Sequence, residues 1–342
     1  MTFDHNDIGR PNGNYFALPY ESGEADIEII SVPWDVTTSY RSGTAQGPQA
    51  IIEASAQVDL FDFERENAWT IRIAGTKLDL ADLNVVNRAL AEKIIAHLEA
   101  GGKLDDKEIA EALSRVNRAS ETMNDLVYDA ACKILNQNKF AAVVGGEHST
   151  PFGLIKALAE RNPAGMGILQ IDAHADLRCA YEGFLWSHAS IMYNVLHRTE
   201  GVEKLVQVAI RDLCDEEIQL AERCNKIVMF PDRMLKTAEF TGKTWHEQCT
   251  EIISNLPQNV YISFDIDGLS PSLCPGTGTP VPGGLSFPQA AYLIRQLAKS
   301  KKTIIGFDLN EVAPAPTGDW DANVGARMLF ELCCSVSLNR GI

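Results

Sequence analysis

The sequence predicts a three-layer α/β protein in which a parallel sheet lies between helices. Short apolar runs of strand length alternate with segments that carry apolar residues at helical spacing. The runs are continuously apolar, which is typical of parallel strands buried on both faces. Hydrophobic residues make up 45% of the 342 residues and charged residues 22%, as in ordinary globular proteins.

The amino-terminal part begins with a polar lead-in over residues 1–25, followed by a predicted strand over 26–36. Glycine and proline interrupt the next stretch, 37–55, which we expect to be a loop. Apolar residues at helical spacing then predict a helix-rich segment over 83–137. The sequence indicates no role for that segment beyond packing.

The rest of the chain alternates between strand and helix patterns, which predicts parallel strands joined by helices. No segment rich in Gly, Ser or Pro divides it and no internal repeat occurs, so we expect a single domain over 1–342. The predicted strands lie at 139–146, 165–173, 204–212, 226–230, 259–267 and 302–312, and the helices near 150–161, 187–198, 214–224, 243–256, 286–299 and 321–339.

Charge and cysteine usage narrow the classes of function. The formal net charge of −16 argues against nucleic acid as a partner, because phosphate binding needs a basic face. The same charge is compatible with a small cationic substrate. No run approaches the roughly 20 apolar residues that span a membrane, and the start lacks the pattern of a secretory signal. We therefore expect a cytoplasmic protein with reduced thiols rather than disulfides.

Ionisable residues gather where the predicted strands end. The run "GILQIDAHAD" ends in Asp172, His174 and Asp176, which occupy every second position. Ligands bind at the carboxyl ends of the strands in an open parallel sheet. Three such groups on one face of an extended segment could not be buried without a cation to offset them. Three other strands end in the same kinds of residue, namely Glu147 with His148, Asp265 with Asp267, and Asp308 with Glu311.

Together these residues predict a binuclear metal site. Histidines and aspartates without cysteine favour Mn²⁺ or a similar divalent ion over structural zinc. Six ligands are too many for one open catalytic ion, but they suit two ions about 3.5–4 Å apart that share bridging carboxylates. The candidate ligands are His148, Asp172, His174, Asp176, Asp265 and Asp267.

Four motifs resemble the signatures of the ureohydrolases, the arginase and agmatinase family, which cleaves guanidino groups to urea and an amine. They are "GGEHS" (145–149), "DAHADLR" (172–178), "SFDIDGLSPS" (263–272) and "EVAP" (311–314). The resemblance covers residues 27 to 335. It implies the arginase/deacetylase-like fold, a doubly wound and mostly parallel sheet of about eight strands, in a homotrimer or homohexamer.

The resemblance also assigns the candidate ligands to two ions per chain. Mn²⁺ is the expected metal, with Ni²⁺ as the alternative. Asp172 and Asp265 would bridge the ions. The first ion would be held by His148, Asp172, Asp176 and Asp265, and the second by Asp172, His174, Asp265 and Asp267.

Three residues would carry the reaction that the resemblance implies. Asp176 would accept a proton from the metal-bound hydroxide that attacks the substrate. Glu311 would hold the planar guanidinium by a charge-assisted contact, and His188, with an unperturbed pKa near 6.5, would deliver a proton to the leaving amine. The stretch 176–188 is more similar to agmatinase-like members than to arginases. Agmatine is therefore the first expected substrate, with arginine, guanidinobutyrate and guanidine as alternatives.

Several residues leave two interpretations open. Glu147 would orient a metal ligand or stabilise a turn. Trp186 would line the pocket or pack a loop, and Arg178 with Glu182 would reach the substrate or form a surface pair. Cys214 stands where arginases carry a carboxylate for the substrate's α-amino group, which weakens arginine as the substrate. Other classes of function are a binuclear metallophosphatase, which would need a basic phosphate pocket, and a catalytically silent subunit, which the complete ligand set argues against.

Overall fold

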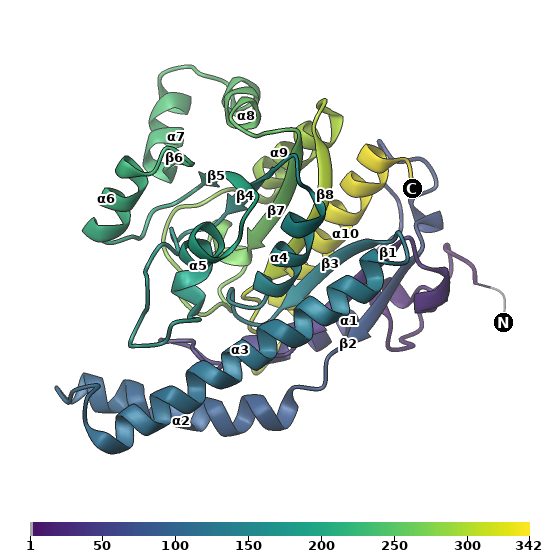
Figure 1. Cartoon of the computed structure of the whole chain (residues 1–342). Coiled ribbons are helices and arrows are strands. Elements are labelled where there is room, and N and C mark those ends of the chain that lie inside the picture. The colour runs from purple at the N-terminus through teal and green to yellow at the C-terminus, as the bar shows by residue number, and fades with distance from the viewer. Residues whose placement is uncertain (1–2) are drawn as a thin grey trace.

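The computed structural model describes residues 3–342 and contains an eight-stranded sheet in which every pair of neighbouring strands is parallel. The strand order is β2-β1-β3-β8-β7-β4-β5-β6 (Figure 1). The predicted three-layer fold is confirmed, and the sheet is wholly rather than mostly parallel. The strands are β1 (Ile27–Val32), β2 (Ile73–Lys77), β3 (Phe140–Gly145), β4 (Met166–Ile171), β5 (Val202–Val208), β6 (Ile227–Phe230), β7 (Asn259–Asp265) and β8 (Thr303–Asn310).

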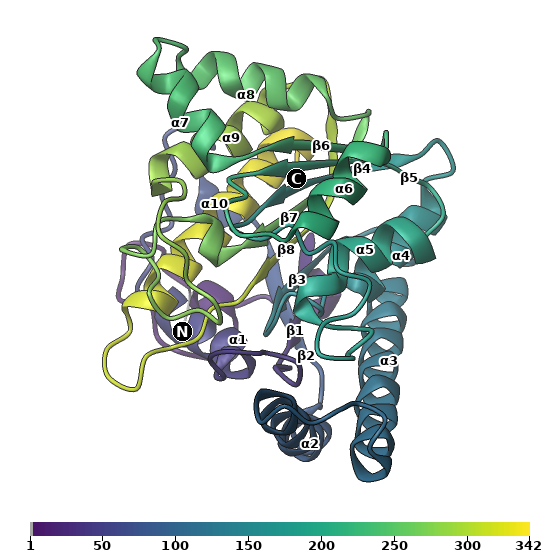
Figure 2. The same cartoon turned by 90° about the vertical axis from the view of Figure 1, so that its left-hand side faces the viewer.

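Helices cover both faces of the sheet (Figures 1 and 2). Helices α2 to α6 pack on one face and α1 with α7 to α10 on the other. Within residues 3–342, none of these helices combines the length and apolar character needed to cross a membrane. They are α1 (Gly47–Ser55), α2 (Ala81–Glu99), α3 (Lys107–Leu135), α4 (Phe152–Arg161), α5 (Ile191–Arg198), α6 (Asp215–Arg223), α7 (Asp232–Phe240), α8 (Trp245–Ser254), α9 (Phe287–Lys299) and α10 (Trp320–Arg340).

The two layers explain why the strands are continuously apolar. Successive side chains of a strand point to opposite faces of the sheet. In β1, Ile27 and Ile29 belong to the hydrophobic cluster on one face, whereas Ile30 and Val32 belong to the cluster on the other. Both sets must be apolar because helices cover both faces.

Three parts of the chain differ from the sequence-based expectation. The stretch 37–55 was expected to be a loop, but its end forms α1, in which Pro48 occupies the first turn and so costs no hydrogen bond. Strand β2 and helix α7 were not predicted. The lead-in is not wholly polar in character, because Tyr15, Phe16 and Leu18 are buried in the core. Residues 1 and 2 of the lead-in lie outside the described residues.

The sheet topology places the predicted site at the centre of the molecule. Strands β3, β8, β7 and β4 are consecutive neighbours in the sheet. Their registers pair Val144 with Leu309, Leu309 with Phe264, and Phe264 with Ile171. These strands therefore end at the same level, and the residues that follow them meet at one edge.

Helices α2 and α3 form an antiparallel pair, which we call the helical arm, beside the sheet (Figure 1). Only part of each helix faces the core, through residues such as Ile94 of α2 and Met123 of α3. Other positions on the arm, including Val85 and Val86, are exposed. The arm is the predicted helix-rich segment over 83–137.

Candidate metal centre

The candidate ligands converge as the strand order requires. One group consists of His148, Asp172 and Asp265, whose ligand atoms all lie within 4.8 Å of one another. A second group, defined by the same distance, consists of Asp172, His174 and Asp267. Asp172 belongs to both groups, whereas Asp265 belongs to the first alone, and the bridging roles that the resemblance implies for these two residues stay predictions.

The first group is arranged around one nitrogen of His148. Its Nδ1 lies 3.0 Å from Asp172 Oδ2, 3.1 Å from Asp176 Oδ2 and 3.3 Å from Asp265 Oδ2. This nitrogen is buried and makes no hydrogen bond within residues 3–342. A ring nitrogen that faces three carboxylate oxygens in a buried site fits a shared cation.

The second group is more accessible. His174 Nδ1 lies 3.1 Å from Asp267 Oδ2 and 3.6 Å from Asp172 Oδ1. The side chain of His174 is 22% exposed, whereas Asp172 is fully buried. The second group therefore forms the side of the centre that a substrate can reach.

The charges of the centre do not balance without a cation. Burial would lower the pKa of His148, but Asp172, Asp176 and Asp265 raise it well above its ordinary value. Burial and the neighbouring Asp172 raise the pKa of Asp176 to about 7. Burial, Asp267 and Asp172 raise the pKa of Asp265 well above its usual range. The site thus holds more carboxylate charge than two imidazoles offset, and divalent ions suit it.

A hydrogen-bonded layer behind the centre orients these side chains. His148 Nε2 lies 2.8 Å from Ser263 Oγ, which donates to Asp308 Oδ1 at 3.1 Å. On the other side, Gln170 Nε2 donates to Asp172 Oδ2 at 2.8 Å. Asp308 therefore stands behind His148 and is not a member of either ligand group. Partners of this kind fix which ring nitrogen faces a metal.

Asp176 and Glu311 have backbones that few residues adopt. Their φ angles are +54° and +66°, in the left-handed region. The neighbouring chain holds both in place. The carbonyl of Asp176 accepts bonds from the N–H groups of Met192 and Tyr193, and the N–H of Glu311 donates to Gly146 at 2.8 Å. Strained backbone held in this way is concentrated at functional sites.

Glu311 presents one free oxygen beside the centre. Its Oε1 accepts a hydrogen bond from the N–H of His148 at 2.8 Å. Its Oε2 is buried and has no hydrogen-bond partner among residues 3–342. Burial, together with the charge of Glu147, raises the pKa of Glu311 well above its ordinary value. A cationic ligand at Oε2 would remove both costs.

His188 lies at the start of a short helical turn, His188–Ser190, and its backbone N–H donates to Thr37 Oγ1 at 3.2 Å. Its ring packs edge-on against Tyr181, with 6.1 Å between the ring centroids. Burial, with a contribution from His174, lowers the pKa of His188 to about 3. The site therefore shifts the pKa of His188 below the unperturbed value of 6.5 and favours the neutral imidazole.

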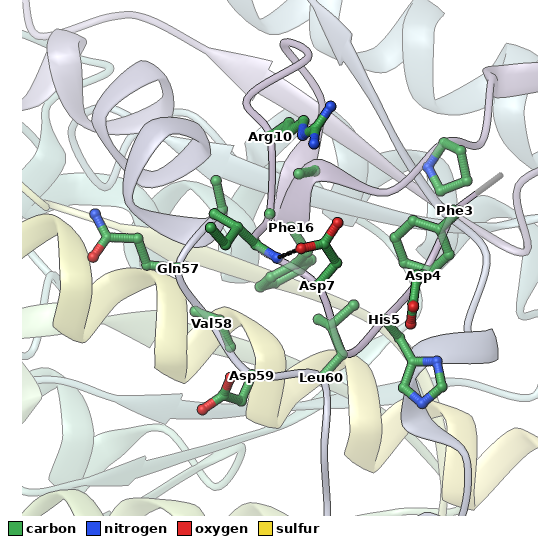
Figure 3. A pocket seen from close by; sticks show the side chains of 15 residues that line it. Phe3, Asp4, His5, Asp7, Arg10, Phe16, Gln57, Val58, Asp59 and Leu60 are labelled. Atoms are coloured by element: carbon green, nitrogen blue, oxygen red, sulfur yellow. Dashed lines mark hydrogen bonds between the residues drawn. The ribbon is translucent and has the colours of Figure 1, made fainter. Parts of the chain in front are cut away.

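A cavity of about 130 Å³ opens onto the centre, and His174, Asp176 and His188 line it. Arg178 and Tyr181 stand at its side, and the Arg178 guanidinium lies 4.9 Å from the Tyr181 ring. Figure 3 shows a larger cavity, of about 430 Å³, between the amino-terminal segment and residues 56–60. None of the predicted site residues lines that second cavity.

Trp186, Arg178 and Glu147, for which the sequence left two interpretations open, have well-defined neighbours in the structure. Trp186 packs against Phe152, with 4.8 Å between ring centroids, and does not line the cavity at the centre. Arg178 faces Glu217, with 3.7 Å between Nε and Oε2, and it forms no ion pair with Glu182. Glu147 stabilises a neighbouring loop rather than a ligand, because its bonding partners are Thr37 and Ser149.

Two residues of the site were not found from the sequence. Thr37 and Ser263 contact His188 and His148, from which they are separated by more than a hundred positions. Ser263 had one usable signal, since it lies two residues before Asp265 and so on the same face of the strand. Thr37 had none, because a threonine in a predicted loop is common.

A doubly wound parallel sheet that gathers two histidines and four aspartates at the ends of its central strands defines an α/β protein with a candidate binuclear metal centre. A family model described as "Arginase family" matches residues 25–334, and the chain belongs to this family. The predicted family and class of enzyme, hydrolases of C–N bonds in linear amidines, are thereby confirmed.

Individual relatives agree with that assignment. The chain is 30% identical over 291 residues to the N(1)-aminopropylagmatine ureohydrolase of Synechocystis, covering 85% of this chain and 82% of the relative. It is 31% identical over 325 residues to an agmatinase of Neisseria meningitidis serogroup A, covering 92% and 88%. Its fold is similar to the agmatine ureohydrolase of Thermoplasma volcanium, with a TM-score of 0.72 at 22% identity over 95% and 94% of the two chains.

Proposed function

We propose that this chain hydrolyses the guanidino group of a small cationic substrate to urea and an amine. Membership of the arginase family supports this class of reaction. The observation that carries the proposal is Oε2 of Glu311, which is buried without a hydrogen-bond partner among residues 3–342, while Oε1 of the same side chain accepts from the N–H of His148. A buried carboxylate oxygen in that place suits a planar guanidinium, which binds carboxylates through fixed, charge-assisted hydrogen bonds.

Six residues would hold the metal. We propose that the set first identified in the sequence binds two divalent ions, Mn²⁺ or alternatively Ni²⁺, with Asp172 and Asp265 between them. When bound, the ions would activate water as the nucleophile and offset the charge that develops on the substrate. The ligands would be His148, Asp172, Asp176 and Asp265 for one ion and Asp172, His174, Asp265 and Asp267 for the other.

The remaining roles follow from proton balance. A guanidinium ion and water give urea and an alkylammonium ion, so both protons of the water are transferred to the leaving nitrogen, one of them through solvent and one inside the site. Asp176, which lines the cavity beside the ligand groups, would accept that proton. His188 lines the same cavity with a neutral imidazole and relays the proton to the leaving nitrogen. Glu311 orients the guanidinium throughout.

Agmatine is the first substrate to test, in line with the name of the Neisseria relative, and the name of the Synechocystis relative adds N(1)-aminopropylagmatine. Protein loaded with Mn²⁺, and separately with Ni²⁺, is incubated with these two compounds and with arginine, guanidinobutyrate, guanidinopropionate and guanidine, and urea is measured. We expect urea from at least one, with bound metal near two ions per chain by elemental analysis.

Asp176→Asn should abolish urea release, because the amide cannot accept the proton. Asparagine tolerates the left-handed backbone at this position and keeps one oxygen as a possible ligand, so a loss with both ions still bound would report on proton transfer. The matched control is Asp129→Asn on the exposed side of α3, which should be as active as the unmodified protein. Absence of urea from every compound, with both ions bound, would contradict these substrates.

We also propose that the chain forms a homotrimer or homohexamer, as the resemblance to the family implies. Light scattering after gel filtration would then give a molar mass of three or six times 37.5 kDa. A mass of 37.5 kDa at micromolar concentration would contradict this assembly.

A further inference from the structure

Two loops meet at the cavity beside the centre, and one threonine joins them. The first mouth loop comprises residues 35–43, and the second comprises residues 176–190 and carries His188. Thr37 of the first loop accepts a hydrogen bond at Oγ1 from the N–H of His188 at 3.2 Å. Within residues 3–342, no other hydrogen bond links the two loops.

Thr37 is itself fixed by the buried carboxylate of Glu147. The N–H of Thr37 donates to Glu147 Oε2 and its hydroxyl donates to Oε1, both at 2.8 Å. The hydroxyl of Ser149 donates to Oε1 at the same distance. Thr37 and Glu147 are fully buried. A buried carboxylate with three donors keeps one orientation, because losing a donor leaves an oxygen unsatisfied away from water.

The Thr37 hydroxyl determines which group donates and which accepts in the two hydrogen bonds that it makes. It has one hydrogen, which goes to Glu147, and two lone pairs, one of which is left for the N–H of His188. The connection therefore runs from the His188 backbone through Thr37 to the end of β3, next to His148. It needs a hydroxyl at position 37, and an apolar side chain of the same shape cannot replace it.

We propose that Thr37 is a positioning residue for His188. Together with Glu147, it holds the backbone from which the imidazole reaches the cavity. This inference rests on the proposed function, in which His188 relays a proton. A proton relay depends on distance, so a displaced imidazole slows the chemical step. Glu311, which would bind the guanidinium, is oriented by the N–H of His148 and not by Thr37, so we expect substrate binding to be unaffected.

Two variants of nearly equal size test the hydroxyl. Thr37→Val keeps the shape and removes the hydroxyl, whereas Thr37→Ser keeps the hydroxyl and removes the methyl group. We expect Thr37→Val to lower kcat roughly tenfold to a hundredfold with KM within about twofold. Thr37→Ser should keep kcat near that of the unmodified protein. Equal losses in the two variants, or a loss carried by KM, would overturn the proposal.

A His188→Asn background separates positioning from general stability. If Thr37 acts through His188, adding Thr37→Val to His188→Asn costs no further activity. An equal loss in both backgrounds would show that Thr37 acts independently of His188 and would refute the inference. Thr37→Ala, which leaves room for a water, takes the place of Thr37→Val if the latter does not fold.

Hydrogen exchange provides a readout that does not depend on activity. The amide of His188 should exchange about tenfold faster in Thr37→Val than in Thr37→Ser, because its acceptor is gone. The amide of Leu185, which donates to Asn117 at 2.9 Å, is the internal control and should not change. Unchanged exchange at His188 would overturn the proposal. Because this readout needs no turnover, absence of urea in the unmodified protein would refute the proposed function separately.

Discussion

Asp176 and Glu311 show how single residues depart from their local preferences at the centre. Both take a left-handed backbone, which costs of order 1–3 kcal/mol at a residue other than glycine. The hydrogen bonds of the surrounding chain enforce it. The left-handed backbone turns the chain after β4 and after β8, so that the side chains of Asp176 and Glu311 lie next to His148. Substitutions at these positions therefore change backbone strain as well as chemistry, unless asparagine or glycine is used.

Ser263 should influence metal affinity although it is not a ligand. In Ser263→Ala, His148 Nε2 loses its 2.8 Å partner, and the ring orientation is no longer fixed. We expect the affinity for Mn²⁺ to fall about tenfold, measured by titration of metal-free protein against a competing chelator. Ser270→Ala, at a partly exposed serine downstream, is the control. Equal affinity in the two variants would show that Asp308 and Ser263 do not orient His148.

The sequence was informative about the centre where function depends on residue type at a strand end. His148, Asp172 and Asp265 were identified because parallel strands bring their ends together, and the structure places them in contact. Their metal-binding role stays a prediction. The pKa of His188 could not be predicted, because it depends on how the second mouth loop is buried. The part played by Thr37 is likewise visible only in three dimensions.

The helical arm has a role that its sequence did not indicate. On α2, Asn84 exchanges two hydrogen bonds with Asp35, at 2.8 and 2.9 Å. On α3, Asn117 accepts a bond from the N–H of Leu185. Each helix of the arm thus holds one of the two mouth loops. Residues outside the sheet, on the helical arm, therefore help to hold the loops beside the candidate metal centre.

Asn84→Ala tests whether the hydrogen bonds from α2 to Asp35 stabilise the first mouth loop. The variant leaves the N–H and a carboxylate oxygen of Asp35 unsatisfied in a buried place, so we expect a loss of about 2 kcal/mol in the free energy of unfolding. Denaturation with guanidinium chloride measures the free energy of unfolding. The urea released from substrate measures the accompanying loss of activity. Val85→Ala, at an exposed neighbour on α2, should change neither. A neutral Asn84→Ala would show that α2 does not hold the loop.

A second connection between elements depends on pH. Arg295 of α9 lies 2.7 Å from Asp62 and 2.6 Å from Glu331 of α10 and is 7% exposed. Burial would raise the pKa of Asp62, but the N–H groups of Glu64 and Arg65 and the Arg295 guanidinium hold it below its ordinary value. A depressed pKa contributes stability that is present above the unfolded pKa and lost as the pH falls through the folded one.

Arg295→Met should therefore destabilise the protein in a pH-dependent way. It leaves Asp62 and Glu331 close together without a cation, and we expect a loss of about 3 kcal/mol at pH 7. As the pH falls toward about 4, these carboxylates take up protons in the folded state, so the deficit relative to the unmodified protein shrinks. Denaturation at several pH values measures it, with Lys299→Met as control. A deficit that is constant with pH would contradict this account.

Two of the elements that were missed, β2 and α1, have separate physical causes. Strand β2 lies at the edge of the sheet, so only its first two residues are buried, and it lacks the continuous apolar run of the central strands. Helix α1 begins at Gly47 and Pro48, which in a sequence are typical of a turn, although proline is favoured in the first turn of a helix. Central strands and long amphipathic helices, by contrast, were located within a few residues.

At the scale of the whole molecule, metal and folding should be coupled. The four aspartates of the centre are buried together, so ions that bind only the folded state relieve their repulsion. At a free Mn²⁺ concentration a hundredfold above Kd, the gain is about 2.7 kcal/mol. Calorimetry should show the Tm falling on chelation and recovering on addition of Mn²⁺, with no response in Asp265→Asn. A Tm that is the same with chelator and with Mn²⁺ would contradict metal binding at these aspartates.

We also propose that the chain unfolds as one domain, because both hydrophobic clusters span the same sheet. The same calorimetric scan should then show a single transition for metal-loaded protein. Two separable transitions would contradict a single domain over 1–342.

The place of β8 in the sheet has a consequence for biosynthesis. It is the last strand to leave the ribosome, yet it lies between β3 and β7. Asp172, His174 and Asp267 follow β4 and β7, which are direct neighbours, so they can assemble while the chain is still being made. His148 follows β3 and cannot reach them until β8 has been inserted. We therefore expect the group of Asp172, His174 and Asp267 to be able to take up an ion earlier in biosynthesis than the group that needs His148.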